Sequence, residues 1–305
     1  FRGTPGMIDH DRLFKELIST FFVEFLELFL PQVVREIDRE SIQFLPQEVF
    51  NDVTSGDKKE IDLLAQVRYQ QQETYFLIHV ENQSYSQSDF AKRMFKYFAR
   101  LHEKYDLPIY PVVIFSFDEP QRREPENYQL AFSDLQVLDF NFQAIQLNQL
   151  RWRDYLTQSN PVAAALMAKM KIPPSERPQV KAECLRLLIT LKLDPARMQL
   201  ISGFVDVYLN LNGTEEELFQ VTANNMGLLQ EEKYMEIVTS WERKARQEGI
   251  QEGIQQGVQQ GVQEAQETIA INLLRRGMGA EETREITGLS LERVRELQGR
   301  LQQDN

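Results

Sequence analysis

Two carboxylic acids stand in strand-like sequence at positions from which they can act together. Asp62 lies in a short apolar segment, and Glu81 lies in the segment His79–Ser84. The residues just before Glu81, Tyr75–Val80, are rich in aromatic and β-branched side chains, which predicts a strand. A polar stretch over 70–74 separates the two segments, so we predict that they form a hairpin.

The register of this hairpin decides whether the two acids meet. Side chains alternate across a strand, so Asp62 shares a face with Leu64, and Glu81 shares a face with His79 and Gln83. If Asp62 pairs directly opposite Glu81, both carboxylates lie on one side of the sheet. Adjacent carboxylates repel each other unless a positive charge lies between them. Mg²⁺ is the expected occupant, because it binds one or two carboxylates and keeps water and phosphate in its other positions.

The elements around the hairpin predict a mixed α/β fold. Apolar residues at three- and four-residue spacing predict one amphipathic helix over Asp11–Leu30, which Pro31 is expected to end. A second helix is predicted over 87–105, a buried strand over 108–115, and one strand or two over 137–147. This order gives a mixed sheet with helices on its faces.

From Trp152 onward the pattern is helical, and we place a domain boundary near 150–160. Residues 1–6 precede Met7 and are expected to be a remnant of cloning, not a signal peptide. The expected parts are a sheet-containing core (7–155), a helical region (156–228), a long helix with glycine repeats (229–268) and a helical hairpin with helix-turn-helix-like spacing (269–305).

The long helix contains a four-residue repeat in which each glycine is followed by Ile or Val. The repeated glycines are Gly249, Gly253, Gly257 and Gly261. A glycine in a helix interior costs roughly 1 kcal/mol relative to alanine, so an isolated helix of this sequence is weak. Two interpretations are open: a semi-flexible helical connector, or close packing against a second copy that makes a homodimer through the C-terminal helices.

The C-terminal hairpin contains several basic residues. They are Arg275, Arg276, Arg284, Arg293 and Arg295. Arginines of this kind contact phosphates, but acidic residues are interleaved with them. We therefore favour a helical hairpin that packs on itself or on a partner.

The overall composition restricts the classes of partner. The 305 residues carry a net charge of −12, which counts against DNA as a partner unless positive charge is concentrated locally. The lone Cys184 excludes an internal disulfide and fits a reducing cytoplasm, and only three histidines are present, which makes a zinc site unfavourable. No apolar run approaches the roughly 18 to 20 residues of a membrane helix, so we expect a cytoplasmic protein that does not span a membrane.

A series of short motifs occurs in a characteristic order. They are Asp11–Lys15, Asp62 on a strand, Val80–Ser84, a helix with Arg93, Met94 and Tyr97, and the strand 111–115. In order and spacing they resemble the Rpn family of recombination-promoting nucleases and transposases, which belongs to the PD-(D/E)XK nuclease superfamily. The resemblance covers about residues 9–150, and the glycine–glutamine repeat is also typical of such proteins.

The resemblance implies a restriction-endonuclease-like core over 7–155 that cuts DNA with Mg²⁺ or Mn²⁺. Asp62 corresponds to the aspartate of the superfamily and Glu81 to the acidic residue of its E-x-K motif, so both are expected to bind the metal. Gln83 stands where the superfamily has lysine. Its carbonyl oxygen can still orient water or bind a metal, but it carries no charge.

Further residues are candidates for accessory roles in this site. An acidic residue of the first helix often completes it, and Asp11 and Glu16 are both candidates. The candidates for the missing positive charge are Lys58, Lys59 and Lys96. His79 either assists proton transfer or, as we favour, is a structural histidine bonded to a carbonyl group.

Basic residues recur on the helix after Glu81. They are Lys92, Arg93, Lys96, Arg100 and Lys104. Such a row can follow a phosphate backbone placed over the site, and the alternative is an ordinary solvated face paired with Asp89 and Glu103.

We therefore expect a metal-dependent DNA endonuclease that hydrolyses phosphodiester bonds and is associated with transposition or recombination. The first alternative is a non-catalytic DNA- or protein-binding module that keeps the nuclease fold. The second is a helical oligomerisation or regulatory protein whose sheet domain binds something else. The sequence has no glycine-rich phosphate loop of the P-loop or dinucleotide type, which counts against nucleotide binding.

Overall fold

The computed structural model of the 305-residue chain describes residues 10–46, 49–51, 58–60, 62–70 and 75–303. For residues 49–51, 58–60, 242, 244–249, 252 and 302–303 it describes the backbone alone. The chain divides into two compact units, Phe1–Ile237 and Val238–Asn305. The domain boundaries expected from the sequence stay predictions.

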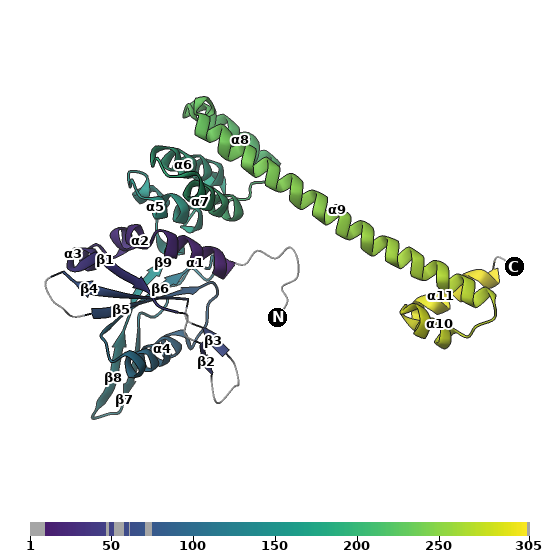
Figure 1. Cartoon of the computed structure of the whole chain (residues 1–305), viewed down its shortest axis with the longest axis horizontal. Helices are drawn as coiled ribbons and strands as arrows, with labels where there is room; N and C mark the ends of the chain where they lie inside the picture. The colour runs from purple at the N-terminus through teal and green to yellow at the C-terminus, as the bar shows by residue number, and fades with distance from the viewer. Residues whose placement is uncertain (1–9, 47–48, 52–57, 61, 71–74, 304–305) are drawn as a thin grey trace. The chain divides into compact units, whose positions relative to one another are not determined.

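A five-stranded mixed sheet forms the centre of the first unit (Figure 1). The strand order is β1-β4-β5-β6-β9, with antiparallel pairing from β1 to β5 and parallel pairing from β5 to β9. The strands are β1 (Ile37–Phe44), β4 (Leu63–Tyr69), β5 (Tyr75–Gln83), β6 (Ile109–Phe115) and β9 (Gln143–Gln146). The expected mixed α/β fold with flanking helices is confirmed.

Different helices cover the two faces of this sheet (Figure 1). Helix α4 (Phe90–Tyr105) packs on one face, where Leu101 lies against Leu64 and Leu77. Helices α1 (His10–Thr20) and α2 (Phe22–Phe29) lie on the opposite face. A fully buried side chain of this size contributes roughly 1.5–3 kcal/mol, so the alternation of β5 between the two apolar layers fixes its register.

The single helix predicted over Asp11–Leu30 is wrong, because the chain forms two helices with an interruption at Phe21 (φ −120°, ψ 42°). Helical hydrogen bonds cross the interruption, since Phe21 N–H donates to the Leu17 carbonyl at 3.1 Å and Phe25 N–H donates to the Phe21 carbonyl at 2.8 Å. The apolar spacing therefore continues unbroken and does not reveal the interruption. Pro31 begins α3 (Pro31–Glu36) instead of only ending α2, because proline is well tolerated at the first position of a helix.

Helices after the sheet belong to the same compact unit and begin at identifiable caps. They are α5 (Pro161–Leu166), α6 (Arg177–Thr190), α7 (Pro195–Tyr208) and α8 (Gly213–Asn225), with the 3₁₀ turn η3 (Met167–Lys169) after α5. The Asn160 side chain accepts from Val162 N–H at 2.8 Å, a cap worth about 1 kcal/mol, and its amide donates to the Glu24 carbonyl of α2 at 2.8 Å. The helical region is therefore joined directly to the helices that cover the sheet.

Several strands of the structure are not predicted from the sequence. They are β1, β2 (Val49–Asn51), β3 (Lys58–Glu60) and β7 (Asn127–Ala131). β2 pairs with β3, and β7 pairs with β8 (Gln136–Asn141). The segment 137–147, expected as one strand or two, forms two strands, β8 and β9.

The second unit contains most of α9 (Glu232–Arg275) and the hairpin of α10 (Ala280–Thr287) and α11 (Leu291–Gln303). Gly288 joins the two short helices at φ 72°, a conformation that favours glycine. Arg293 of α11 donates through Nε and Nη2 to the two carboxylate oxygens of Glu267 in α9, each at 2.9 Å. Arg293 therefore joins α11 to α9 within the second unit. Among the described residues, no helix has the length and apolar character needed to cross a bilayer.

Candidate active site

The hairpin of β4 and β5 brings Asp62 close enough to Glu81 for their carboxyl groups to interact. The ladder ends with the pair of Leu63 and Val80, which are the direct neighbours of Asp62 and Glu81 in the chain. Asp62 directly precedes β4, and Glu81 lies near the carboxyl end of β5. The backbone N–H of Asn82 donates to Asp62 Oδ2 at 2.7 Å. The predicted β4–β5 hairpin is confirmed, whereas direct pairing of Asp62 with Glu81 stays a prediction, because Asp62 lies one residue before the ladder.

The surroundings of Asp62 disfavour its charged form. Burial raises the pKa of its carboxyl group to about 7, and the charge of Glu81 adds to the rise. The hydrogen bond from Asn82 lowers the pKa, Asp11 raises it, and Lys15 lowers it. Three carboxylic acids therefore interact here with limited compensation, which is the electrostatic character of a cation-binding or acid–base site.

His79 and Glu81 form a buried pair on the face that α4 covers. Their side chains are 0% and 6% exposed, and His79 Nε2 lies 2.8 Å from Glu81 Oε1. The partner of this histidine is thus a carboxylate and not the expected carbonyl group. His79 Nδ1 is buried with no hydrogen-bond partner among the described residues, which fits the tautomer that carries its proton on Nε2. The pair fixes the orientation of the Glu81 carboxyl group.

Gln83, which replaces the expected lysine, is also buried and is held at both ends of its amide. Its Oε1 accepts a hydrogen bond from Arg93 Nη2, and its Nε2 donates to the Tyr85 carbonyl. Arg93 also donates to Gln87, and its guanidinium carbon lies 4.8 Å from the centre of the Phe90 ring. A guanidinium from α4 therefore lies directly beside Gln83.

The accessory candidates lie in different places. Asn82 Nδ2 donates to Asp11 Oδ1 at 3.3 Å, so Asp11 is joined to the site from α1. Glu16 is exposed on α1. Lys96 is exposed on α4. Lys58 and Lys59 belong to β3, and their side chains lie outside the part of the chain that is described.

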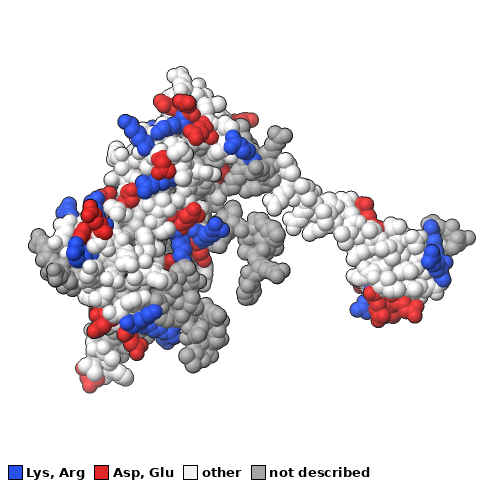
Figure 2. Space-filling view, viewed as in Figure 1, with Lys and Arg blue, Asp and Glu red and all other residues white. Residues whose placement is uncertain are grey.

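The basic row of α4 is divided between two roles. Lys92, Lys96 and Lys104 are exposed, Arg100 is partly buried, and Arg93 is bound to Gln83. Figure 2 shows lysine and arginine side chains over the region of α4, with acidic side chains close to them. Positive charge on the face shown is thus local and does not extend as one broad patch. Phosphate contact by this row stays a prediction.

The sequence profile of one protein family matches the chain over residues 8–190. That family is described as "Putative transposase, YhgA-like". The chain belongs to this family. The matched region of this YhgA-like protein contains the whole five-stranded sheet, α4 and every residue of the candidate site. The resemblance to the Rpn family, of PD-(D/E)XK type, is thereby confirmed. Searches among curated proteins and among solved structures found no match.

The donor atoms in this YhgA-like protein fit a divalent cation that keeps much of its water. Among the described residues, no group of three or more His, Cys, Asp or Glu side chains is arranged to hold a metal ion. Mg²⁺ needs only one or two protein carboxylates, and Asp62 and Glu81 are two carboxyl groups in this region. Asn82 Oδ1 is an additional buried oxygen acceptor without a partner in the described part of the chain. Carboxylate and amide oxygens together suit Mg²⁺ and Mn²⁺.

Two contributors to this YhgA-like site are not among the residues predicted for it from the sequence. The Asn82 side chain connects β5 to Asp11, and the Lys15 charge acts on Asp62. Asp11 and Lys15 are four residues apart, so they share one face of α1, and this spacing was the available signal. The side-chain contact of Asn82 carried no such signal, because its partner Asp11 comes from a separate helix.

Proposed function

We propose that this transposase-family protein is a DNA endonuclease that hydrolyses phosphodiester bonds with Mg²⁺ or Mn²⁺ held by Asp62 and Glu81. The observation that supports the proposal most is the placement of these two acids. They lie next to the last pair of the β4–β5 ladder, and their repulsion contributes to a raised pKa of Asp62. A cation between them offsets this repulsion.

The surrounding residues orient the two acids. The Asn82 N–H positions Asp62, and His79 positions Glu81 through Oε1. Asp11 lies close enough to interact with Asp62 and serves as the acid of the first helix. A bound divalent cation supplies a water of lowered pKa and offsets charge on the phosphoryl oxygens.

Arg93 supplies the positive charge that the superfamily carries on lysine. Gln83 uses its carbonyl oxygen to bind the guanidinium of Arg93, so this glutamine positions a cation instead of being one. A guanidinium stays charged at every physiological pH and binds phosphate oxygens in two-pronged fashion. Gln87 and the Phe90 ring hold it in place from the same side.

DNA is the proposed partner, with the exposed lysines of α4 as its first contacts. Lys92, Lys96 and Lys104 lie on the helix that carries Arg93. A phosphate backbone lying along α4 therefore meets positive charge before it reaches Asp62 and Glu81. Because lysines that contact phosphates release counterions from the DNA, we expect this binding to weaken with increasing salt.

A second copy of the chain is the proposed partner of α9. The apolar members of the repeat are all exposed: Ile250, Ile254, Val258 and Val262. A Cβ added at Gly253, Gly257 or Gly261 meets nothing within 4 Å, and the sequence has no charged residue from Gly253 to Gln263. A solvated helix face usually carries charge, whereas an uncharged ridge of i, i+4 spacing suits the packing of one helix across another.

Cleavage of supercoiled plasmid DNA with Mg²⁺ or Mn²⁺ tests the enzymatic proposal. Wild type is compared with Asp62→Ala, Glu81→Ala and, as a matched control, Asp139→Ala, which removes an exposed carboxylate of β8. We expect wild type and the control to cut and both site variants to lose cutting. Cutting that survives both site substitutions contradicts the proposal. DNA retention without cutting by wild type supports the non-catalytic alternative instead.

A further inference from the structure

A small cavity lies at the sheet edge where β5 and β6 end. Its volume is about 200 Å³, below the roughly 300–1,000 Å³ typical of pockets for whole small molecules. It therefore suits a group of about the size of a phosphate with part of its sugar. The polar residues that line it include Asp118, Asn148, Lys169, Lys171, Arg177 and Tyr208.

The central feature of the cavity is an ion pair whose two members differ widely in solvent exposure. Lys169 Nζ lies 2.6 Å from Asp118 Oδ1, but the lysine side chain is 8% exposed and the aspartate side chain is 81% exposed. A buried ammonium requires a nearby anion, whereas an exposed carboxylate is solvent-screened and is held only weakly. Lys169 thus remains where it is, and Asp118 is the member of the pair that another anion can replace.

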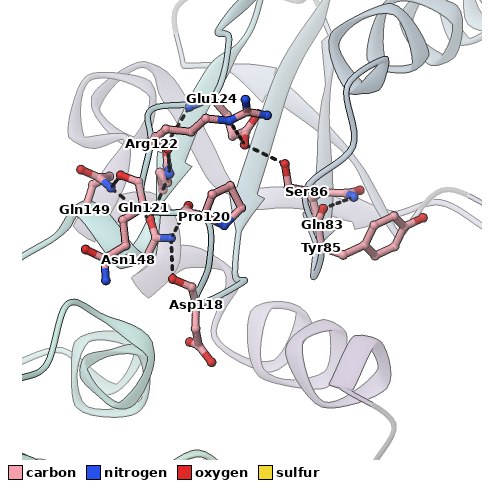
Figure 3. A network of polar contacts seen from close by, with 11 residues as sticks. Gln83, Tyr85, Ser86, Asp118, Pro120, Gln121, Arg122, Glu124, Asn148 and Gln149 are labelled. Atoms are coloured by element: carbon pink, nitrogen blue, oxygen red, sulfur yellow. Dashed lines mark hydrogen bonds and ion pairs between the residues drawn. The ribbon is translucent and has the colours of Figure 1, made fainter. Parts of the chain in front are cut away.

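The main chain at Asp118 is fixed although its side chain is exposed. Asn148 Nδ2 donates to the carbonyl groups of Asp118 and Pro120, each at 3.1 Å. Figure 3 shows the Asp118 carboxylate directed away from this network. Rotation of the Asp118 side chain therefore needs no movement of the loop after β6.

If the Asp118 side chain turns to solvent, the remaining charged residues around the cavity carry an excess of positive charge. Glu119 is the second carboxylate in the lining, and Lys171 and Arg177 are the further cations. Arg177 Nε donates to Glu215 at 3.1 Å, so this arginine is partly compensated. Lys169 and Lys171 then face a single acid, Glu119.

Direct contacts join the cavity to the candidate active site. The Tyr208 hydroxyl lies 2.9 Å from His10 Nδ1, and the neighbouring Asp11 accepts from Asn82. On the other side, Ser116 N–H donates to the Gln83 carbonyl at 3.0 Å, so β6 leads from the site to the cavity rim. The loop after β5 is tied to the loop after β6 by a 3.0 Å hydrogen bond from the Ser86 hydroxyl to Glu124 (Figure 3).

From this geometry we infer that the cavity binds a phosphate group of the DNA strand, at a position other than the bond that is cut. The arriving phosphate takes the place of the Asp118 carboxylate on Lys169, and Asp118 turns to solvent. The inference rests on the proposed function, because it takes the strand to be the one whose scissile bond lies at Asp62 and Glu81.

The test is equilibrium binding of a fluorescent single-stranded oligonucleotide to the full-length chain in EDTA, followed by anisotropy. Because EDTA removes the metal, the DNA is not cleaved during the binding measurement. Asp118→Asn removes the competing anion and keeps the side chain's shape, so we expect roughly threefold tighter binding. Lys169→Met removes the cation, so we expect roughly tenfold weaker binding and a salt slope reduced by about 0.7, the value for one lost phosphate contact on a single strand.

Lys181→Met is the matched control. Lys181 is as buried as Lys169, with 5% of its side chain exposed, and it pairs with Asp206 at 3.2 Å, but it does not line the cavity. We expect this variant to bind the oligonucleotide as wild type does. Asp118→Asn is expected to bind the oligonucleotide more tightly, and an unfolded protein would not show tighter binding. The test therefore remains decisive even if Lys169→Met unfolds.

Unchanged affinity and salt slope in both cavity variants overturn the inference. Calorimetry with orthophosphate separates the two possible sources of the phosphate. Binding of orthophosphate that depends on Lys169, with no effect of either variant on the oligonucleotide, assigns the cavity to free phosphate and contradicts a strand contact. Plasmid cleavage distinguishes failure of this inference from failure of the proposed function. If wild type cuts DNA while both cavity variants bind the oligonucleotide as wild type does, only the phosphate site in the cavity is overturned.

Discussion

The backbone N–H of Asn82 lies 2.7 Å from Oδ2 of Asp62, so the residue that follows Glu81 orients the Asp62 carboxyl group. Because this donor belongs to the main chain of β5, the relative position of the two acids depends on the β4–β5 register and not on flexible side chains. A slip of one residue would send the acids to opposite faces of the sheet. The chemistry proposed for this site thus depends directly on strand pairing.

Asp62→Asn should stabilise the metal-free protein at high pH. The pKa of Asp62 is about 7 in the folded chain and 3.8 in its unperturbed state, so folding favours the protonated acid. Its stabilising contribution is complete below about pH 4 and is lost as the pH rises to about 7. At about 1.4 kcal/mol per pKa unit, the loss is on the order of a few kcal/mol. Asparagine resembles the neutral acid and does not undergo this loss.

Urea denaturation in EDTA at pH 5 and pH 8 measures this difference. The free energy of unfolding of wild type should fall between the two pH values by more than that of Asp62→Asn. Asp139→Asn, on the exposed side of β8, should follow wild type. Parallel changes in wild type and Asp62→Asn would show that Asp62 titrates normally in the folded chain.

Arg93→Ala should reduce cleavage while leaving metal affinity nearly unchanged. Removal of a single positioned charge near the reacting phosphate typically costs about 10²–10³-fold in turnover. Arg93→Lys should recover part of the loss, because it returns the charge without the two-pronged geometry. Lys92→Ala, an exposed neighbour on α4, is the control and should affect DNA affinity only. Turnover and Mn²⁺ affinity are measured separately, and a parallel loss of both in Arg93→Ala contradicts the assigned role.

His79→Leu should destabilise the chain and loosen Glu81. The substitution leaves a carboxylate that is 6% exposed without its hydrogen-bond partner, which costs about 1–3 kcal/mol or more for a charged group. His102→Leu is the control, since His102 is exposed and its Nδ1 lies 3.1 Å from the Leu107 carbonyl oxygen. Thermal unfolding at pH 7 compares the variants. Equal melting temperatures for the two would show that the buried pair contributes nothing to stability.

The double substitution Ile254→Gln, Val258→Gln should convert a dimer into a monomer. Both side chains are exposed on α9, at 63% and 60%, and pairing with a second copy buries them. The control is Gln256→Ala with Gln260→Ala, because these positions lie about 200° further round the helix. Sedimentation equilibrium gives the mass per particle. Wild type that is already monomeric, or a double variant that stays dimeric, removes α9 as the contact.

The sequence predicted the β4–β5 hairpin because its signal is local. Alternating apolar residues and a polar turn determine which residues of a hairpin face each other, and this brings the neighbours of Asp62 and Glu81, Leu63 and Val80, into register. The strand β1 gave no such signal, since Ile37–Phe44 is largely polar and pairs with β4 across the long segment between them. Its position follows from tertiary packing alone.

The finer parts of the site depend on residues far apart in the chain. The Arg93–Gln83 contact crosses from α4 to β5, and the Asn82–Asp11 contact crosses 71 positions. Single-sequence periodicity gives the faces of helices and strands but not the angles at which helices meet the sheet. For this reason Arg93 was grouped with exposed phosphate contacts, although its guanidinium is bound to Gln83 and Gln87.

Mn²⁺ binding measured by electron paramagnetic resonance tests the central proposal most directly, because it reports the metal site without DNA or turnover. We expect about one bound Mn²⁺ per chain in wild type and in Asp139→Asn, and none in Asp62→Asn or Glu81→Gln. Equal Mn²⁺ binding by wild type and both site variants would contradict a site formed by Asp62 and Glu81.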